Sequence, residues 1–181
     1  MTMADTNLYE TDILAWSEQQ TSALRELAQR RDLPNALDLT HVLEQIGDVG
    51  LSELNAVRSF IQLILRHAVK CIVDPDERRV RHWHVEISNW QGELERRISR
   101  SMHQRIDLDM LWDRAVRQAE LDLLDQSDQP SAVDLVRLLR GTPCPISLDS
   151  VLLDATDPGA LVRRVMDGLR ACNAIAWPPS P

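Results

Sequence analysis

The residues with the greatest chemical potential lie in one short segment, Asp76 to His84, which reads DERRVRHWH. A guanidinium group can bind phosphate or carboxylate through two parallel hydrogen bonds. An imidazole group can transfer protons near neutral pH. The segment therefore predicts a binding site for a phosphate or an acidic partner, with these residues as candidates: Arg78, Arg79, Arg81, His82 and His84.

A second interpretation explains the same residues without a ligand. At helical spacing, Val80 and Trp83 point inward, while Arg79, His82 and Glu86 share an outer row. Such a row is typical of a solvated, ion-paired helix surface. Positive side chains near a helix start oppose the helix dipole, and that conflict favours a use for the charges. Both interpretations stay open at this point.

Catalysis by this segment would need a second element that the sequence does not supply. Some helical toxin ribonucleases use an arginine to hold phosphate and a nearby histidine as acid or base. Arg79 to His84 and Arg97 to His103 fit that spacing. The motif is short in an arginine-rich chain, and 6 glycines leave little room for a phosphate-binding loop. We therefore predict no catalytic residue and favour a protein without enzymatic activity.

A metal site is the next alternative. His67 and Cys71 lie four residues apart on an expected helix, and Cys144 could add a third ligand. Zinc sites usually contain closely spaced ligand pairs, and a buried thiol with a core histidine explains these residues equally well. Three cysteines without paired spacing indicate reduced thiols. The sequence predicts no metal, no cofactor and no small-molecule ligand.

The elements that carry these residues are predicted to be helical. Hydrophobic residues make up 44% of the 181 residues and recur at intervals of three and four. The predicted fold is all-α, a helical bundle of about four longer helices plus several short ones. The longer helices are expected at Asp12–Arg31, Ser52–Val73, Arg79–Ser101 and Leu108–Ser127.

Local signals set the expected helix ends. A short helix from Asp38 is predicted to end at Gly50 in a left-handed conformation, and Ser52 is predicted to cap the next helix. The first two helices would then form a hairpin. The third helix is apolar around most of its circumference, so it is expected at the bundle centre. Asp157 and Pro158 are typical of the start of a last helix.

Charge and hydropathy limit the class of partner and the compartment. The formal net charge of −8 argues against a general nucleic-acid binder. The longest strongly apolar run, Phe60 to Leu65, is far shorter than the roughly 20 residues of a membrane-spanning helix. No secretory signal pattern opens the chain. We expect no membrane association and a cytoplasmic protein.

Three sequence blocks resemble the bacterial family of domains of unknown function numbered 29. They are LYETDILAWSEQQTSALRE, the pair LEQIGDVG and LILRHAVKCIVDPDERRVRHW, and CPISLDSVLLD. The resemblance covers residues 8–154 and implies a soluble, all-helical domain there. It implies no activity. Residues 155–181 are expected to be a C-terminal helical extension with a proline-rich tail.

The sequence favours a non-enzymatic module that binds a protein partner or itself. Five tryptophans stand beside one Phe and one Tyr, and four fall on apolar stripes. Trp83 and Trp90 are expected to be core residues or, at a bundle edge, a docking stripe. The alternative function is association with nucleic acid, with or without ribonuclease activity, through Arg78 to His84.

Overall fold

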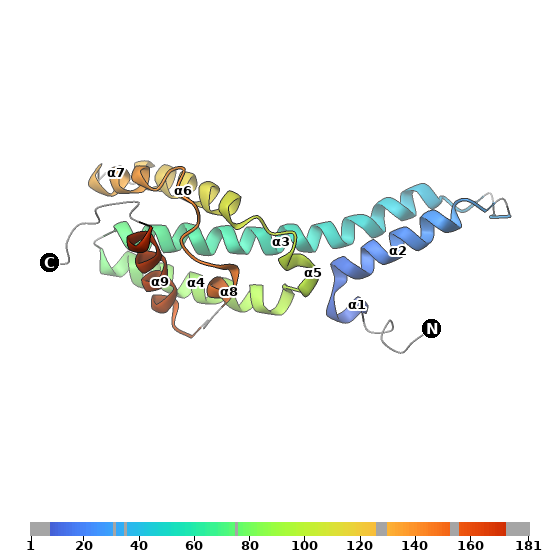
Figure 1. Cartoon of the computed structure of the whole chain (residues 1–181), viewed down its shortest axis with the longest axis horizontal. Coiled ribbons are helices and arrows are strands. Elements are labelled where there is room, and N and C mark those ends of the chain that lie inside the picture. Colours follow the sequence, from blue (N-terminus) through green and yellow to red (C-terminus); the bar gives the residue numbers. More distant parts are fainter. Residues whose placement is uncertain are drawn as a thin grey trace. The chain divides into compact units, whose positions relative to one another are not determined.

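The computed structural model describes residues 8–30, 32–34, 36–74, 76–125, 130–152 and 156–172. Within these ranges the chain is helical and contains no strand, which confirms the all-α fold (Figure 1). None of the helices found there combines the length and the apolarity needed to cross a bilayer. The helices are α1 (Leu8–Thr11), α2 (Ile13–Leu27), α3 (Leu39–Val73), α4 (Glu77–Arg97), α5 (Arg100–His103), α6 (Leu108–Asp125), α7 (Pro130–Leu138), α8 (Leu148–Leu152) and α9 (Pro158–Ala171).

The chain divides into two compact units. The first unit contains the residues up to Val57 together with Arg97–Ile106. The second unit contains Arg58–Arg96 and the residues from Asp107 onward. Helix α3 passes from one unit into the other, and each unit is described here by itself.

The second unit holds most of the apolar core. The second half of α3 is buried on nearly all sides, as its apolar circumference predicts, with Ile61, Ile64 and Leu65 fully buried. The predicted stripe of α4 faces inward through Trp83, Ile87 and Leu94. Helix α6 contributes Trp112 and its apolar neighbours at helical spacing. Helices α7, α8 and α9 add further buried side chains: Val136, Val151, Leu161, Val165 and Leu169.

Polar contacts attach the later segments of this unit to α4 and α6. Gln91 on α4 donates from Nε2 to the Val151 carbonyl at 2.9 Å. The Asp109 carboxylate on α6 accepts from the backbone N–H of Cys144 at 2.7 Å. Asp157 caps α9 by accepting from the Ala160 N–H, with Pro158 in the first turn, as predicted. The expected proline-rich tail, residues 173–181, lies outside the described residues.

In the first unit, α2 lies along the first half of α3 (Figure 1). The helices approach closely at Gly50, where a β-carbon would lie 2.0 Å from Ser17 Oγ and 3.2 Å from Leu14 Cα. Ser17 is buried, and its hydroxyl donates to the Leu14 carbonyl at 2.9 Å. A glycine is therefore needed at this crossing because any side chain would push the helices apart.

The prediction of two helices separated at Gly50 is wrong. Helix α3 is continuous from Leu39 to Val73, so Gly50 and Ser52 lie in its interior and neither ends nor starts a helix. The first hairpin is therefore made by α2 and the first half of this long helix. Continuity keeps the backbone hydrogen bonds intact, and Gly50 serves the helix contact instead.

The predicted helix Arg79–Ser101 is also two elements. Helix α4 ends at Arg97, Ser99 is extended with φ −117° and ψ 168°, and α5 begins at Arg100. The residues at this break form hydrogen bonds with a distant residue. Asp12, which caps α2, accepts from Ser99 Oγ at 2.8 Å and from the Ser101 N–H at 3.0 Å. Local sequence gives no sign of this contact because Asp12 is far away in the chain.

Two glycines of α3 provide a matched test of the crossing. Gly50→Ala is expected to destabilise the protein by about 1 kcal/mol or more, because the added methyl meets the α2 backbone. Gly47→Ala is expected to stabilise it by up to about 1 kcal/mol, because the nearest atom is Thr21 Oγ1 at 4.0 Å and alanine favours helix. Urea unfolding followed by circular dichroism measures both. An equal gain in both variants would contradict the close approach at Gly50.

Candidate functional site

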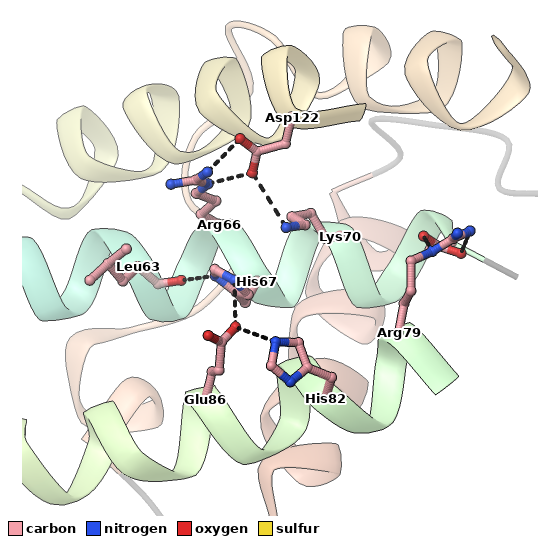
Figure 2. A network of polar contacts seen from close by, with 9 residues as sticks. Leu63, Arg66, His67, Lys70, Arg79, His82, Glu86 and Asp122 are labelled. Carbon is pink, nitrogen blue, oxygen red and sulfur yellow. Dashed lines mark hydrogen bonds and ion pairs between the residues drawn. The ribbon is translucent and has the colours of Figure 1, made fainter. Parts of the chain in front are cut away.

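A buried histidine lies at the centre of a polar network in the second unit (Figure 2). His67 Nδ1 lies 3.0 Å from the Leu63 carbonyl oxygen, and its Nε2 lies 3.0 Å from Glu86 Oε2. The ring meets Trp90 edge-on with centroids 4.7 Å apart, and Trp83 lies farther away at 6.3 Å. The site thus places an imidazole between two oxygen atoms and two indoles.

Glu86 connects this buried imidazole to an exposed one. The same Oε2 atom lies 3.7 Å from Nε2 of His82, whose side chain is 68% exposed. Figure 2 shows both histidines directed toward the carboxylate, His67 from α3 and His82 from α4. The predicted outer row is therefore present, but one of its members also reaches a core residue.

The protonation of His67 is set by competing neighbours. Burial lowers the pKa of His67 below its ordinary value, and the positive charges of Lys70 and Arg66 act in the same direction. The Leu63 carbonyl and the Glu86 carboxylate oppose them. A neutral imidazole has one N–H and can donate to only one of these oxygens. A protonated imidazole could donate to both oxygens, but it would be a buried positive charge, which is costly.

A second carboxylate neutralises the cations beside His67. Asp122 on α6 binds the Arg66 guanidinium through both oxygens, with Nε to Oδ2 at 2.6 Å. Lys70 Nζ lies 3.4 Å from the same Oδ2 and 4.4 Å from the centre of the Trp83 ring. Lys70 is 5% exposed, so its ammonium depends on these two partners. The network connects α3 to α6 and α4.

Arg79 is one of the predicted binding residues. It lies in the first turn of α4 and binds Asp74, which follows the end of α3. Its Nε and second nitrogen donate to the two oxygens of Asp74 at 2.7 and 2.8 Å. The Asp74 side chain is 1% exposed, so the guanidinium neutralises a buried carboxylate. This two-pronged geometry is the one expected for a phosphate, but here it serves a residue of the same chain.

The other four predicted binding residues face different surroundings. Arg81 pairs with Glu77 at 3.2 Å on the helix surface, and His82 faces Glu86. Arg78 is exposed. His84 is half-buried, and burial lowers its pKa, with Asp157 raising it and Arg163 lowering it to a smaller extent. The structure thus distributes the predicted candidates around several carboxylates.

The thiols of Cys71 and Cys144 are held in their protonated form by burial. Burial raises the pKa of Cys71 to about 12 and that of Cys144 to about 11, so both are protonated near neutral pH. Cys71, Cys144 and Cys172 are all unpaired. Among the described residues, no group of three or more His, Cys, Asp or Glu side chains is placed to hold a metal ion.

The tryptophan pair considered as a docking stripe lies mainly inside the second unit. Trp83 is 4% exposed, and Trp90 is half-buried against His67. Sequence reasoning missed a different apolar surface, on the first half of α3. Val42 and Val49 there are 38% and 43% exposed, with Ile46 half-buried between them. The intervals of four and three were a usable signal, but they resembled an ordinary core stripe.

Comparison with known proteins shows which family the chain belongs to. The model of a domain of unknown function, DUF29, matches residues 8–153. The chain belongs to this family. It is also similar to an alpha-helical protein of unknown function from Rhodospirillum rubrum whose crystal structure is known, with 33% identity and a TM-score of 0.74. That match covers 86% of this chain and 96% of the other, and no curated protein matches.

The family match confirms the resemblance seen in the sequence blocks and the unknown-function, all-helical assignment. It ends at residue 153, so α9 lies beyond it. Helix α9 nevertheless buries Leu161, Val162, Val165 and Leu169 in the second unit. This last helix therefore belongs to the packed structure of this DUF29 protein.

Removing the charge of Asp122 tests the network. Asp122→Asn is expected to lower the free energy of unfolding by about 2 to 3 kcal/mol, because it leaves buried Lys70 without a counter-charge. Asp113→Asn on the same helix removes the partner of exposed Arg117 and should cost less than about 0.5 kcal/mol. Urea unfolding measures both, and similar losses in the two variants would contradict a structural role specific to Asp122.

The lowered pKa of His67 predicts a pH dependence of stability. Because the folded pKa lies below the unfolded value of 6.5, the unfolded state takes up this proton first as pH falls. Stability is therefore full above pH 6.5 and decreases below it, by at most about 1.4 kcal/mol per pH unit for this group.

Urea unfolding between pH 7.5 and 5.5 checks this expectation. His67→Gln should have a shallower decrease than the parent protein, because it removes the group whose pKa is lowered in the folded state. Equal slopes for His67→Gln and the parent would show that His67 is not held neutral by burial.

Proposed function

We propose that this DUF29 protein is a non-enzymatic protein-interaction module and that its contact surface lies on the α2–α3 hairpin of the first unit. The observation that carries the proposal is the imbalance of that unit. Among its described residues, the buried apolar side chains are Leu14, Leu54, Val57 and Met102. Its exposed large apolar side chains outnumber them by one: Tyr9, Leu37, Val42, Val49 and Leu51.

This imbalance favours a partner for a physical reason. Burying apolar surface is the main force that holds a small unit together, and small units bury the least of it. Exposed apolar residues that gather on one element mark interaction surfaces more often than scattered ones do. Val42 and Val49 lie on one side of α3, two turns apart.

A hollow on the same hairpin offers a second contact. It has a volume of about 370 Å³ and is lined by Leu14, Ser17, Glu18, Thr21, Arg25, Gly47 and Leu51. The Ser17 and Thr21 hydroxyls already donate to carbonyls of α2, at 2.9 and 2.7 Å. The hollow therefore presents Leu51 and the bare backbone of Gly47 beside the charged side chains of Glu18 and Arg25, which suits a partner helix with both apolar and polar side chains.

Nucleic-acid association through Arg78 to His84 has less support. The Arg79 guanidinium is committed to Asp74, and Arg81 pairs with Glu77. The chain carries a net charge of −8, whereas phosphate binding requires a local excess of basic charge. The same contacts are consistent with the interpretation of this segment as an ion-paired surface.

A capture experiment tests the function. The tagged full chain is expected to retain a protein from a nuclease-treated bacterial lysate, and Val42→Glu with Val49→Glu should lose it. Leu121→Glu with Leu124→Glu is the matched control, since it charges two exposed apolar residues of α6 and should retain the partner. Quantitative mass spectrometry measures the retained protein.

The contrary outcome is equally specific. Nucleic acid retained without nuclease and lost in Arg78→Ala with Arg81→Ala would favour the alternative function. Arg79 is left unchanged because its removal would leave the buried Asp74 carboxylate unpaired and destabilise the fold. Retention that is unaffected by charging Val42 and Val49 would overturn the proposed contact surface.

A further inference from the structure

Helix α9 contacts α4 beside a histidine with an unsatisfied ring nitrogen. His84 on α4 is half-buried, and its Nε2 atom is buried without a hydrogen-bond partner among the residues that the structure describes. The first turn of α9 lies close to the edge of this ring, since a β-carbon on Gly159 would be 3.8 Å from His84 Cε1, the carbon bonded to both nitrogens. The imidazole is therefore part of the interface between the two helices.

The ring is also open to solvent. A hollow of about 240 Å³ has His84 in its wall together with Pro158, the first residue of α9. A second hollow, of about 220 Å³, is also lined by His84. A proton from solvent can therefore reach the imidazole while α9 stays in place.

A proton on His84 has no acceptor at this interface. An imidazolium carries an N–H on both nitrogens, so Nε2 would become a buried donor without a partner. The positive charge would also lie beside the first turn of α9, where the helix dipole is positive. Burial lowers the pKa of His84 below its ordinary value of 6.5, which agrees with this geometry.

The carboxylate that acts on His84 from α9 is already in use. Asp157 Oδ1 accepts from the Ala160 N–H at 3.0 Å and so caps the helix, while Oδ2 accepts from Arg163 at 2.8 Å. After the effect of burial, Asp157 raises the pKa of His84 and Arg163 lowers it. If Asp157 turned to a protonated His84, it would leave the cap. A charged His84 thus either stays unpaired or uncaps α9, and both outcomes weaken the attachment of the first turn.

The other charged side chains that line these hollows are paired. Glu77 and Arg81 lie 3.2 Å apart as an ion pair on α4. Asp74, after the end of α3, accepts two hydrogen bonds from Arg79. Among the described side chains at this interface, only the imidazole has an ordinary pKa between pH 5.5 and 7.5. His84 is therefore the group whose charge changes in that range.

Helix α9 covers apolar surface of the second unit. It lies beyond the family match, which ends at residue 153. Its buried side chains are Leu161, Val162, Val165 and Leu169. Detachment of α9 would expose these side chains and the apolar surface beneath them.

We propose that His84 is a pH switch for the attachment of α9: a proton on its imidazole weakens the contact with the first turn, and α9 detaches to expose the apolar surface that it covers at neutral pH. This switch lies in the second unit and is independent of the contact surface proposed on the α2–α3 hairpin. In the detached state His84 returns toward its ordinary pKa of 6.5, so that state takes up the proton first as pH falls. Opening is therefore expected to increase below pH 6.5, by at most about tenfold per pH unit.

Hydrogen exchange of the full chain, measured by mass spectrometry of peptic fragments, tests the switch. Exchange rates corrected for the pH dependence of intrinsic exchange give the opening equilibrium of each fragment. Between pH 7.5 and 5.5, the protection of the α9 fragment should fall by up to about tenfold. Asp157, whose pKa is lowered by the Arg163 hydrogen bond, loses its contribution only near and below pH 3.8, outside this range.

Two histidine variants identify the responsible group. In His84→Gln the protection of α9 should no longer depend on pH. His67→Gln is the matched control, since it removes another buried imidazole of the same unit, and its α9 protection should fall as in the parent. The measured quantity is the slope against pH, so a uniform loss of protection in His84→Gln leaves the test intact.

Three results would overturn the switch. The first is a parent protein whose α9 protection is constant between pH 7.5 and 5.5, which needs no variant. The second is a His84→Gln variant with the parent slope. The third is a slope that disappears in His67→Gln, because α9 would then open only when the whole unit unfolds.

Discussion

The burial of Lys70 and His67 on α3 is the constraint on which the second unit depends. Both side chains lie on a helix that is otherwise apolar on nearly every side, and a buried charge is costly unless a partner neutralises it. Helix α6 supplies Asp122 for Lys70 and Arg66, while α4 supplies Glu86 for His67 and Trp83 beneath the ammonium. A shift of one residue turns a side chain by about 100° around its helix, so these contacts favour the observed register. The network therefore determines how three helices align, a task that apolar packing alone performs less selectively.

Much of the fold could be predicted from the sequence because the relevant signals are local. The inward stripe of α4 and the start of α6 at Leu108 follow from periodicity and capping over a few residues. The continuity of α3 through Gly50 could not be predicted, because Gly50 is required by its close contact with Ser17 on another helix. Its neighbours in the sequence do not indicate that contact. The end of α4 was missed for the same reason, since Ser99 turns toward Asp12, 87 residues away. Local rules fail where a distant contact uses the same residue.

The candidate site shows the same division. Within DERRVRHWH the residue types were suited to phosphate, and the row shared by His82 and Glu86 was visible at helical spacing. The carboxylates that pair with the basic residues could not all be predicted from the sequence. Asp74 precedes the segment across a helix break, yet it accepts the two parallel hydrogen bonds from Nε and Nη2 of Arg79. Asp122 lies 56 residues from Arg66, and nothing in the spacing connects them. Ion pairs between distant elements therefore decide whether a basic segment is a site or a structural joint.

Helix α3 is buried to very different extents in the two units, and this difference bears on function. In the second unit α3 is surrounded, His67 and Lys70 have charged partners, and the Cys71 thiol is protonated near neutral pH. In the first unit the same helix keeps Val42 and Val49 exposed beside a single covering helix. Exposed apolar residues that gather in one patch mark an interaction surface more often than scattered ones do. The exposed valines of this half of α3 are therefore the part of the described chain on which the proposed interaction rests.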